Sequence, residues 1–294
     1  MQLDKTHIVI RERGFLDTLD LTLHVIRRHA APATAALLLG ALPIAVFNCW
    51  LLGWMTVGPD PAIAKARYVW NMLLLVFIEA PLATVLLTLY LGSVMFLDKT
   101  SVRQILADCW QLSGRIFWSL GTMRGVFLAW LFVLAIGPDE ETQPFEVFLV
   151  LLAIYVGVVR AVRPFVNEII LLERNPLRKK RGQPMTVGRR SAALHGPNSG
   201  DLFGRWLGAA CIAVLLTTSI AFTFWSLSGL LLNDWEWGPI MMHVLIPIAM
   251  WMVVGYFGVV RFLSYLDLRI RREGWEVELR MRAEAQRITR HVMT

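Results

Sequence analysis

The sequence predicts an all-α integral membrane protein with six transmembrane helices, arranged as three pseudo-repeated hairpins with cytoplasmic amphipathic interfacial helices. Three observations lead to this fold class. Hydrophobic residues make up 56% of the 294 residues and charged residues only 17%, whereas soluble domains carry about 25% charge. Several apolar runs reach the roughly 20 residues that cross a bilayer. The basic residues gather in one alternating set of connecting segments.

Turn-forming and charged residues divide the apolar sequence into the six predicted spans. The spans cover residues 34–55, 69–96, 117–136, 145–172, 207–232 and 240–262. We therefore expect a single membrane domain over residues 1–266, followed by a charged cytoplasmic helix over 267–294. Residues 1–30 lack the apolar core of a cleavable signal peptide, so we expect insertion to rely on the first span.

An amphipathic stretch precedes each odd-numbered span. These stretches cover 15–28, 101–115 and, more weakly, 187–194, and apolar residues recur at helical spacing in each. In the first, Phe15, Leu19 and Leu23 share a face opposite Asp17 and Asp20. Such helices are expected to lie in the membrane interface and not to cross the bilayer.

The distribution of lysine and arginine predicts the orientation. Of the 29 basic residues, 27 fall on the side that carries both termini, and only Lys65 and Arg67 fall on the other. Positive charge marks cytoplasmic segments. We therefore expect a multi-pass protein of a bacterial cytoplasmic (inner) membrane with both termini in the cytoplasm.

Repeated features favour three copies of one unit: an amphipathic helix and two spans. The even-numbered spans end alike, in Leu97-Asp98-Lys99, Leu172-Glu173-Arg174 and Leu266–Arg269. The third and fifth spans begin with pairs of glycines four residues apart, Gly121 with Gly125 and Gly204 with Gly208. Such pairs let transmembrane helices approach closely. The repeat predicts three hairpins around a pseudo-threefold axis.

The most basic segment, 174–205, contains an insertion at 175–185 relative to the other two copies. Candidate ligands for anionic lipid headgroups are Arg178, Lys179, Lys180, Arg181, Arg189 and Arg190. The alternative is that these residues only determine topology. Nucleic acid is not expected as a partner, because neither aromatic interleaving nor a binding fold accompanies the charge.

The candidate polar residues inside the predicted spans are Glu79, Arg160, Arg163 and Glu168, and Arg261 of the sixth span is placed similarly to the two arginines. Intramembrane charges are costly and often functional. Glu79 is either a structural hydrogen-bonding group or a proton or cation site. Arg160 and Glu168 are eight residues apart, two turns along one face of a continuous helix. Two interpretations of these charges are open. In the first, the two arginines extend to lipid phosphates; in the second, the charges form a buried ion pair that lines a cavity.

The sequence contains no motif that predicts catalysis, a cofactor or a metal. Gly-x-Ser-x-Gly, His-Glu-x-x-His and phosphate-loop patterns are missing, and the three cysteines lack metal-ligand spacing. The six histidines are isolated, and each is expected at a surface or interface. An enzyme is therefore not expected.

A short pattern resembles a known family. The acid that ends an apolar run at Ile169–Glu173, followed by Arg190-Ser191 and Leu194 before a new span, is similar to the six-span membrane domain associated with glycerophosphoryl diester phosphodiesterases. The resemblance implies a helical membrane domain. It does not imply phosphodiester cleavage, since the catalytic barrel is missing from this sequence.

Two functions are compatible with these features. The first is a non-enzymatic scaffold or accessory subunit of a membrane assembly, which contacts anionic lipids on its cytoplasmic face. Its protein partner would bind the C-terminal helix or the 174–205 loop. The alternative is a small transporter or channel that uses Glu79 and the charges of the fourth span.

Overall fold

A computed structural model describes residues 14–96, 101–136, 144–177 and 185–273, and these residues form helices and connecting turns without strands. Five helices are long and apolar enough to cross a membrane, or six if one bent pair counts as a single span. The all-helical fold with several candidate spans is therefore confirmed.

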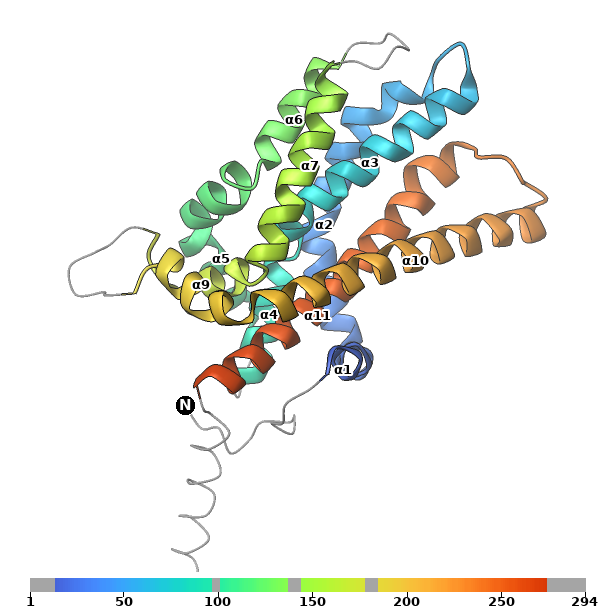
Figure 1. Cartoon of the computed structure of the whole chain (residues 1–294). Coiled ribbons are helices and arrows are strands. Elements are labelled where there is room, and N and C mark those ends of the chain that lie inside the picture. The colour runs from blue at the N-terminus through green and yellow to red at the C-terminus, as the bar shows by residue number, and fades with distance from the viewer. Residues whose placement is uncertain (1–13, 97–100, 137–143, 178–184, 274–294) are drawn as a thin grey trace, which may run out of the picture.

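The first two candidate spans pack against each other (Figure 1). Helix α2 (Ala30–Leu52) contacts both α3 (Pro61–Ala83) and α4 (Val85–Phe96). Gly40 of α2 sits against the carbonyl oxygen of Ala83, where a Cβ atom would lie 2.2 Å from that oxygen. The glycine therefore permits α2 to reach the junction between α3 and α4.

The predicted third and fourth spans are broken. A π-helical turn (Phe117–Thr122) follows α5 (Val102–Ile116), and α6 (Val126–Ala135) starts after Gly125, whose φ is +74°. The bend between these parts is 50°. The fourth span, predicted to continue to residue 172, ends with α7 (Pro144–Val162), and a short α8 (Val166–Leu171) follows Pro164. Proline lacks the N–H that would continue the helix.

The paired glycines differ in what they contact. A Cβ atom on Gly121 would meet the ring of Phe127, a residue of the same span, and Gly125 occupies the left-handed kink. A Cβ atom on Gly125 would also lie 2.7 Å from Leu152 of α7, so this glycine permits the close approach of another helix. Gly204 has no neighbouring atom within 4 Å of its Cβ position, whereas a Cβ atom on Gly208 would lie 3.2 Å from the ring of Phe15.

The last two long helices differ in burial. Helix α9 (Val187–His195) is followed by α10 (Ser199–Leu232). In the segment that these two helices form, none of the residues of the most apolar 18-residue stretch is buried. In the corresponding stretch of residues 61–95, 72% of the residues are buried. Helix α10 packs on α7 and α11 (Ile246–Glu273), and its far end projects from the bundle in Figure 1. The three hairpins contribute unequally to the core, and the threefold repeat stays a prediction.

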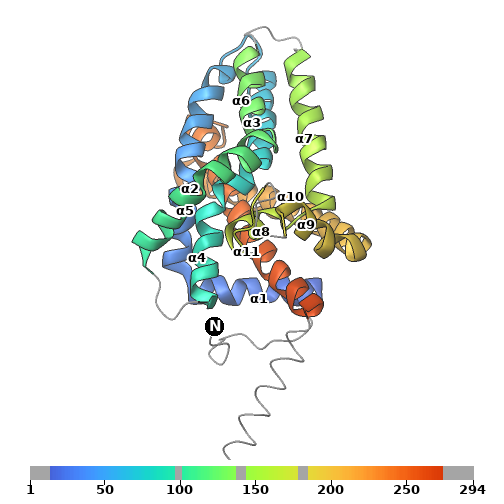
Figure 2. The same ribbon diagram turned by 90° about the vertical axis from the view of Figure 1, so that its left-hand side faces the viewer.

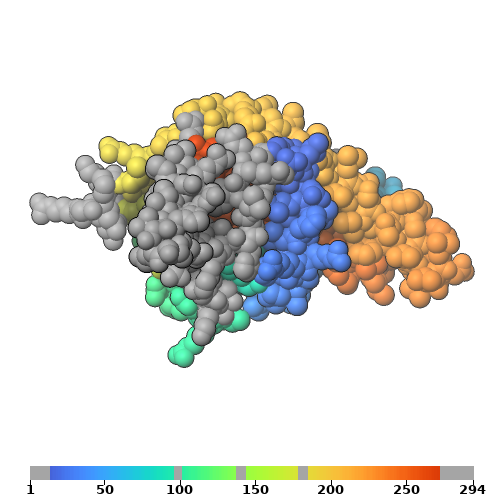
Figure 3. All heavy atoms as spheres, turned by 90° about the horizontal axis from the view of Figure 1, so that it is seen from below, coloured from blue at the N-terminus to red at the C-terminus, as the bar shows by residue number. Residues whose placement is uncertain are grey.

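Three of the helices coincide with the predicted amphipathic stretches: α5, α9 and α1 (Phe15–Arg28). Helix α1 lies across one end of the bundle against α11 (Figure 2), and Figure 3 shows it on that face beside α10. Helix α11 continues without a break from the predicted sixth span to Glu273. Most of the predicted tail helix lies outside the described residues.

Candidate functional site

The helix breaks supply the backbone of the candidate site. Near the end of α3, Pro81 interrupts the hydrogen-bond ladder, and Thr84 donates its hydroxyl to the carbonyl of Ala80 at 2.8 Å. Pro164 separates α7 from α8. Carbonyls released at such breaks inside an apolar environment need other donors.

Side chains of the broken fourth span donate to backbone carbonyls next to the first of these breaks. Arg160 Nη2 donates to the carbonyl of Ile78 at 3.0 Å, and Asn167 Nδ2 donates to the carbonyl of Pro81 at 3.2 Å. The Arg160 guanidinium also lies 4.5 Å from the centre of the Phe77 ring. Arg160 therefore faces the bundle, in contrast to the expectation that it reaches lipid phosphates.

Glu168 is fully buried and pairs with Arg261 of α11, whose Nε lies 2.6 Å from Glu168 Oε1. Arg261 also donates to the Thr84 hydroxyl at 3.1 Å. The prediction that Arg160 and Glu168 share one continuous helical face was wrong, because the break at Pro164 lies between them. Arg163, beside the break, is exposed.

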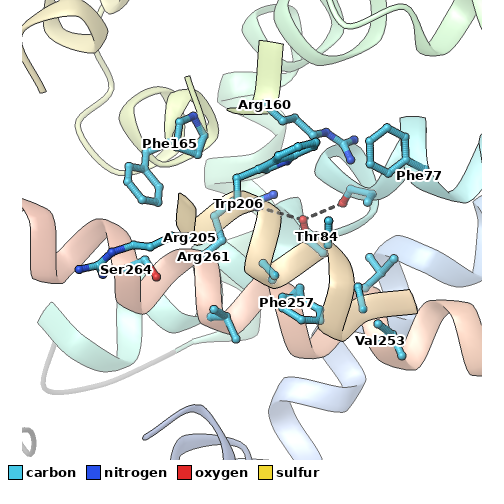
Figure 4. A pocket seen from close by; sticks show the side chains of 18 of the residues that line it. Phe77, Thr84, Arg160, Phe165, Arg205, Trp206, Val253, Phe257, Arg261 and Ser264 are labelled. Atoms are coloured by element: carbon cyan, nitrogen blue, oxygen red, sulfur yellow. Dashed lines mark hydrogen bonds between the residues drawn. The ribbon is translucent and has the colours of Figure 1, made fainter. Parts of the chain in front are cut away.

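A cavity of about 240 Å³ lies among these groups. Its polar lining includes four arginines, Arg124, Arg160, Arg205 and Arg261, together with Thr84 and Ser264. The remaining walls are largely apolar. They include Phe15, Phe77, Phe165, Leu202, Trp206, Ala209, Ala210, Ala213, Val253, Val254 and Phe257. Figure 4 shows Phe77 and Arg160 on one side of the cavity and Val253 and Phe257 on the other.

The four arginines differ in how they are neutralised. Arg261 pairs with Glu168, and Arg205 lies 3.0 Å from Asp201 and 3.6 Å from Asp267. Arg124 is only 4% exposed, and within the described chain its guanidinium makes no hydrogen bond or ion pair. Arg160 has no acidic partner among the same residues, and its Nε is unpartnered. The cavity therefore carries excess positive charge.

Glu79 lies away from this cavity. It is fully buried, and its two carboxylate oxygens accept hydrogen bonds from Asn48 Nδ2 of α2 and Trp130 Nε1 of α6. Glu79 is not among the residues that line the cavity. This arrangement agrees with the structural alternative, in which the carboxylate joins three helices.

Two of the headgroup candidates can be placed. Arg189 is exposed, whereas Arg190 donates to Glu173 through Nε at 2.7 Å and Nη2 at 2.9 Å. Arg190 is thus occupied inside the protein, contrary to its expected role as a free headgroup ligand. Residues 178–181 lie outside the described chain.

Glu173 accepts further hydrogen bonds from two other side chains. Tyr265 donates its hydroxyl at 2.7 Å and Asn175 its amide at 2.9 Å. Burial raises the pKa of Glu173, but the hydrogen bonds from Arg190 and Tyr265 and the charges of Arg190 and Arg269 outweigh it and hold the pKa below its ordinary value. Glu173 and Arg190 belong to the two parts of the sequence pattern that resembles the known membrane-domain family. Their hydrogen bonds show that these two parts lie side by side.

His195 departs from the expectation for histidines. It is 3% exposed, its Nδ1 lies 3.0 Å from Ser191 Oγ, and its Nε2 accepts from the backbone N–H of Phe165 at 3.4 Å. It therefore anchors α9 to the break before α8. Within the described ranges, no group of three or more His, Cys, Asp or Glu side chains could hold a metal ion.

The sequence analysis missed Arg124 as a site residue, and it expected Arg261 to behave like the two arginines of the fourth span, not to pair with Glu168 beside a cavity. An arginine inside a predicted span was the available signal for Arg124. A scan against models of protein families, a search of curated proteins and a search of solved structures each found no match. The resemblance noted in the sequence stays a prediction.

Proposed function

We propose that this chain is a non-enzymatic multi-pass membrane protein that binds an anionic amphiphile, a membrane lipid, in the arginine-lined cavity. The observation that carries the proposal is the combination of four arginines with predominantly apolar walls in one cavity. Arginine forms strong paired hydrogen bonds to phosphate and carboxylate groups. Apolar walls favour a ligand whose charged group carries a hydrocarbon chain.

The cavity lies in the half of the bundle that we assign to the cytoplasmic leaflet of the inner membrane. Most lysines and arginines belong to this half of the bundle. The uneven distribution of positive charge also favours a cytoplasmic location for both termini. Helices α1, α5 and α9 would then lie in the interface. Lipid bound here would link α10, the least buried long helix, to the rest of the bundle.

As a scaffold or accessory subunit, the protein would present its exposed cytoplasmic segments to a protein partner. The candidate contact segments remain the 174–205 loop and the C-terminal helix, where charged residues are concentrated. Arg189, which is exposed, remains a candidate for peripheral contact with lipid headgroups.

The test compares purified protein in nanodiscs of phosphatidylcholine with and without phosphatidylglycerol. We expect the anionic lipid to raise the thermal unfolding temperature. The double variant Arg124→Gln/Arg160→Gln should lose most of this increase, while Arg103→Gln, an exposed arginine on α5, should retain it. Equal stabilisation of all three proteins would refute specific binding in the cavity.

Transport of an anion is the second candidate function. Discontinuous helices often form substrate sites in transporters, and three breaks, near Thr84, Arg124 and Pro164, border the cavity. The separate location of Glu79 argues against its role as a pathway residue. Uptake of labelled anions into proteoliposomes, dependent on Arg160 and independent of Glu79, would favour transport over the scaffold.

A further inference from the structure

We infer that the cavity selects a phosphomonoester, a group that carries close to two negative charges, over a phosphodiester that carries one. This inference rests on the proposed function and specifies its ligand class. It derives from the number of arginines that the protein itself leaves without a countercharge.

The charges around the cavity divide into two groups. Arg261 and Arg205 have acidic partners, Glu168 and Asp201. Arg124 and Arg160 form no ion pair in the described parts of the chain, although the Glu168 carboxylate, which Arg261 holds, also attracts Arg124. An arginine keeps its charge in proteins, and burial of an unpaired charge is strongly unfavourable. Because Glu168 is already paired with Arg261, two guanidinium groups remain without an acid of their own, and this number matches one dianionic ligand.

Internal contacts explain Arg160 only in part and Arg124 not at all. Arg160 satisfies the carbonyl of Ile78 and packs on Phe77, so it has a structural role at the helix break, yet its Nε atom remains buried without a partner. Arg124 is almost fully buried and lines the same cavity, and its Nη2 also lacks a partner. Both unpartnered nitrogen atoms are inaccessible to solvent, so a phosphate in the cavity would contact these two guanidinium groups through their other nitrogen atoms.

The size and lining of the cavity favour a single phosphate attached to a chain. A volume of about 240 Å³ suits one small headgroup and part of its hydrocarbon. The alanines of α10, Ala209, Ala210 and Ala213, contribute small apolar side chains to the lining, together with Val253 and Val254 of α11. A bulky headgroup beyond the phosphate would compete for this space, which adds to the preference for a monoester.

A dianionic phosphate group could also come from the aqueous phase. Inorganic phosphate and a lipid such as phosphatidic acid share the group that the arginines would bind, and they differ in the hydrocarbon that would fill the apolar part. The experiment therefore includes both sources.

The experiment measures binding to the full-length protein in phosphatidylcholine nanodiscs that contain equal mole fractions of phosphatidic acid or phosphatidylglycerol, followed by thermal unfolding and native mass spectrometry. We expect phosphatidic acid to bind about tenfold more tightly, the ratio that one additional charge-assisted contact produces. The preference should disappear when the pH falls below about 6, where a phosphomonoester becomes a monoanion. Inorganic phosphate added to nanodiscs of phosphatidylcholine alone tests the soluble source.

Arg124→Gln provides the sharpest variant. Removal of an unpaired buried charge should leave the ligand-free protein equally or more stable, while the preference for phosphatidic acid falls to about one. The matched control Arg103→Gln removes one exposed positive charge from α5 and should keep the preference. A purely structural Arg124 would instead give a less stable protein with unchanged preference.

The outcomes separate this inference from the proposed function. Equal binding of the two anionic lipids would overturn the phosphomonoester inference and leave anionic-lipid binding intact. Binding of neither lipid, and no stabilisation by inorganic phosphate, would overturn both. Stabilisation by inorganic phosphate equal to that by phosphatidic acid would support recognition of a dianionic phosphate group and would assign the ligand to a soluble source.

Discussion

Arg190 of α9 holds the carboxylate of Glu173 through two hydrogen bonds, of 2.7 and 2.9 Å. The two side chains are 17% and 9% exposed, respectively. They are seventeen positions apart in the sequence, and part of the intervening segment is the basic insertion. The pair therefore closes this segment and fixes the start of α9 against the end of α8.

Loss of this pair should destabilise the protein. Arg190→Gln removes the charge that faces Glu173, and we expect the free energy of unfolding to fall by about 1–3 kcal/mol. Arg189→Gln is a matched control, because it makes the same change at the exposed neighbouring residue. Denaturant unfolding in detergent measures both, and equal effects of the two substitutions would contradict the assignment.

The same carboxylate should make stability depend on pH. The pKa of Glu173 is lower in the folded protein than its ordinary value, so its contribution is fully present above the unfolded pKa of about 4.3. The contribution is lost as the pH falls through the folded pKa. The difference in unfolding temperature between the wild type and Glu173→Gln should therefore be constant near neutral pH and shrink in acid. A difference that grows on acidification would contradict this.

The Glu168–Arg261 pair should show strong coupling. Glu168→Leu leaves the Arg261 guanidinium beside the cavity without its acid, and we expect a loss of about 3–5 kcal/mol, the usual cost of breaking a buried pair. The double variant Glu168→Leu/Arg261→Met should recover much of that loss, since both charges are removed. Additive effects in the double-mutant cycle would show that the two residues act independently.

Glu79 should tolerate glutamine better than leucine. A glutamine can still accept from Trp130 and, after rotation of the Asn48 amide, donate to Asn48. Leucine leaves both polar groups buried without a partner, at a cost of about 1–3 kcal/mol for each. Thermal unfolding of the two variants tests this order. A glutamine variant that folds normally but loses transport activity would restore Glu79 as a pathway residue.

The predicted orientation can be checked by cysteine labelling in intact cells. In a background without Cys49, Cys109 and Cys211, we expect Glu236→Cys to react with a membrane-impermeant maleimide and Arg189→Cys to react only after lysis. Both positions are exposed. The reverse pattern would place the basic segments outside the cytoplasm and would contradict the positive-inside assignment.

Much of the secondary structure could be predicted from local sequence. The amphipathic stretches at 15–28, 101–115 and 187–194 coincide with α1, α5 and α9, because their apolar spacing has the helical period. The breaks were less accessible to prediction. Pro43 lies inside the continuous helix α2, whereas Pro164 separates two helices. Whether proline ends a transmembrane helix depends on neighbours that satisfy the released carbonyls.

The sequence by itself determined the helical membrane class and the bias of positive charge, since hydropathy and charge add along the chain without reference to contacts. Only the tertiary structure decided the partners of the buried charges. Glu168 pairs with Arg261, 93 residues away, and not with Arg160 in the same predicted span. Arg124 gains its significance only beside Arg160, at a cavity shared by several helices. The physical reason is that ion pairs form through space, at distances that local periodicity does not encode.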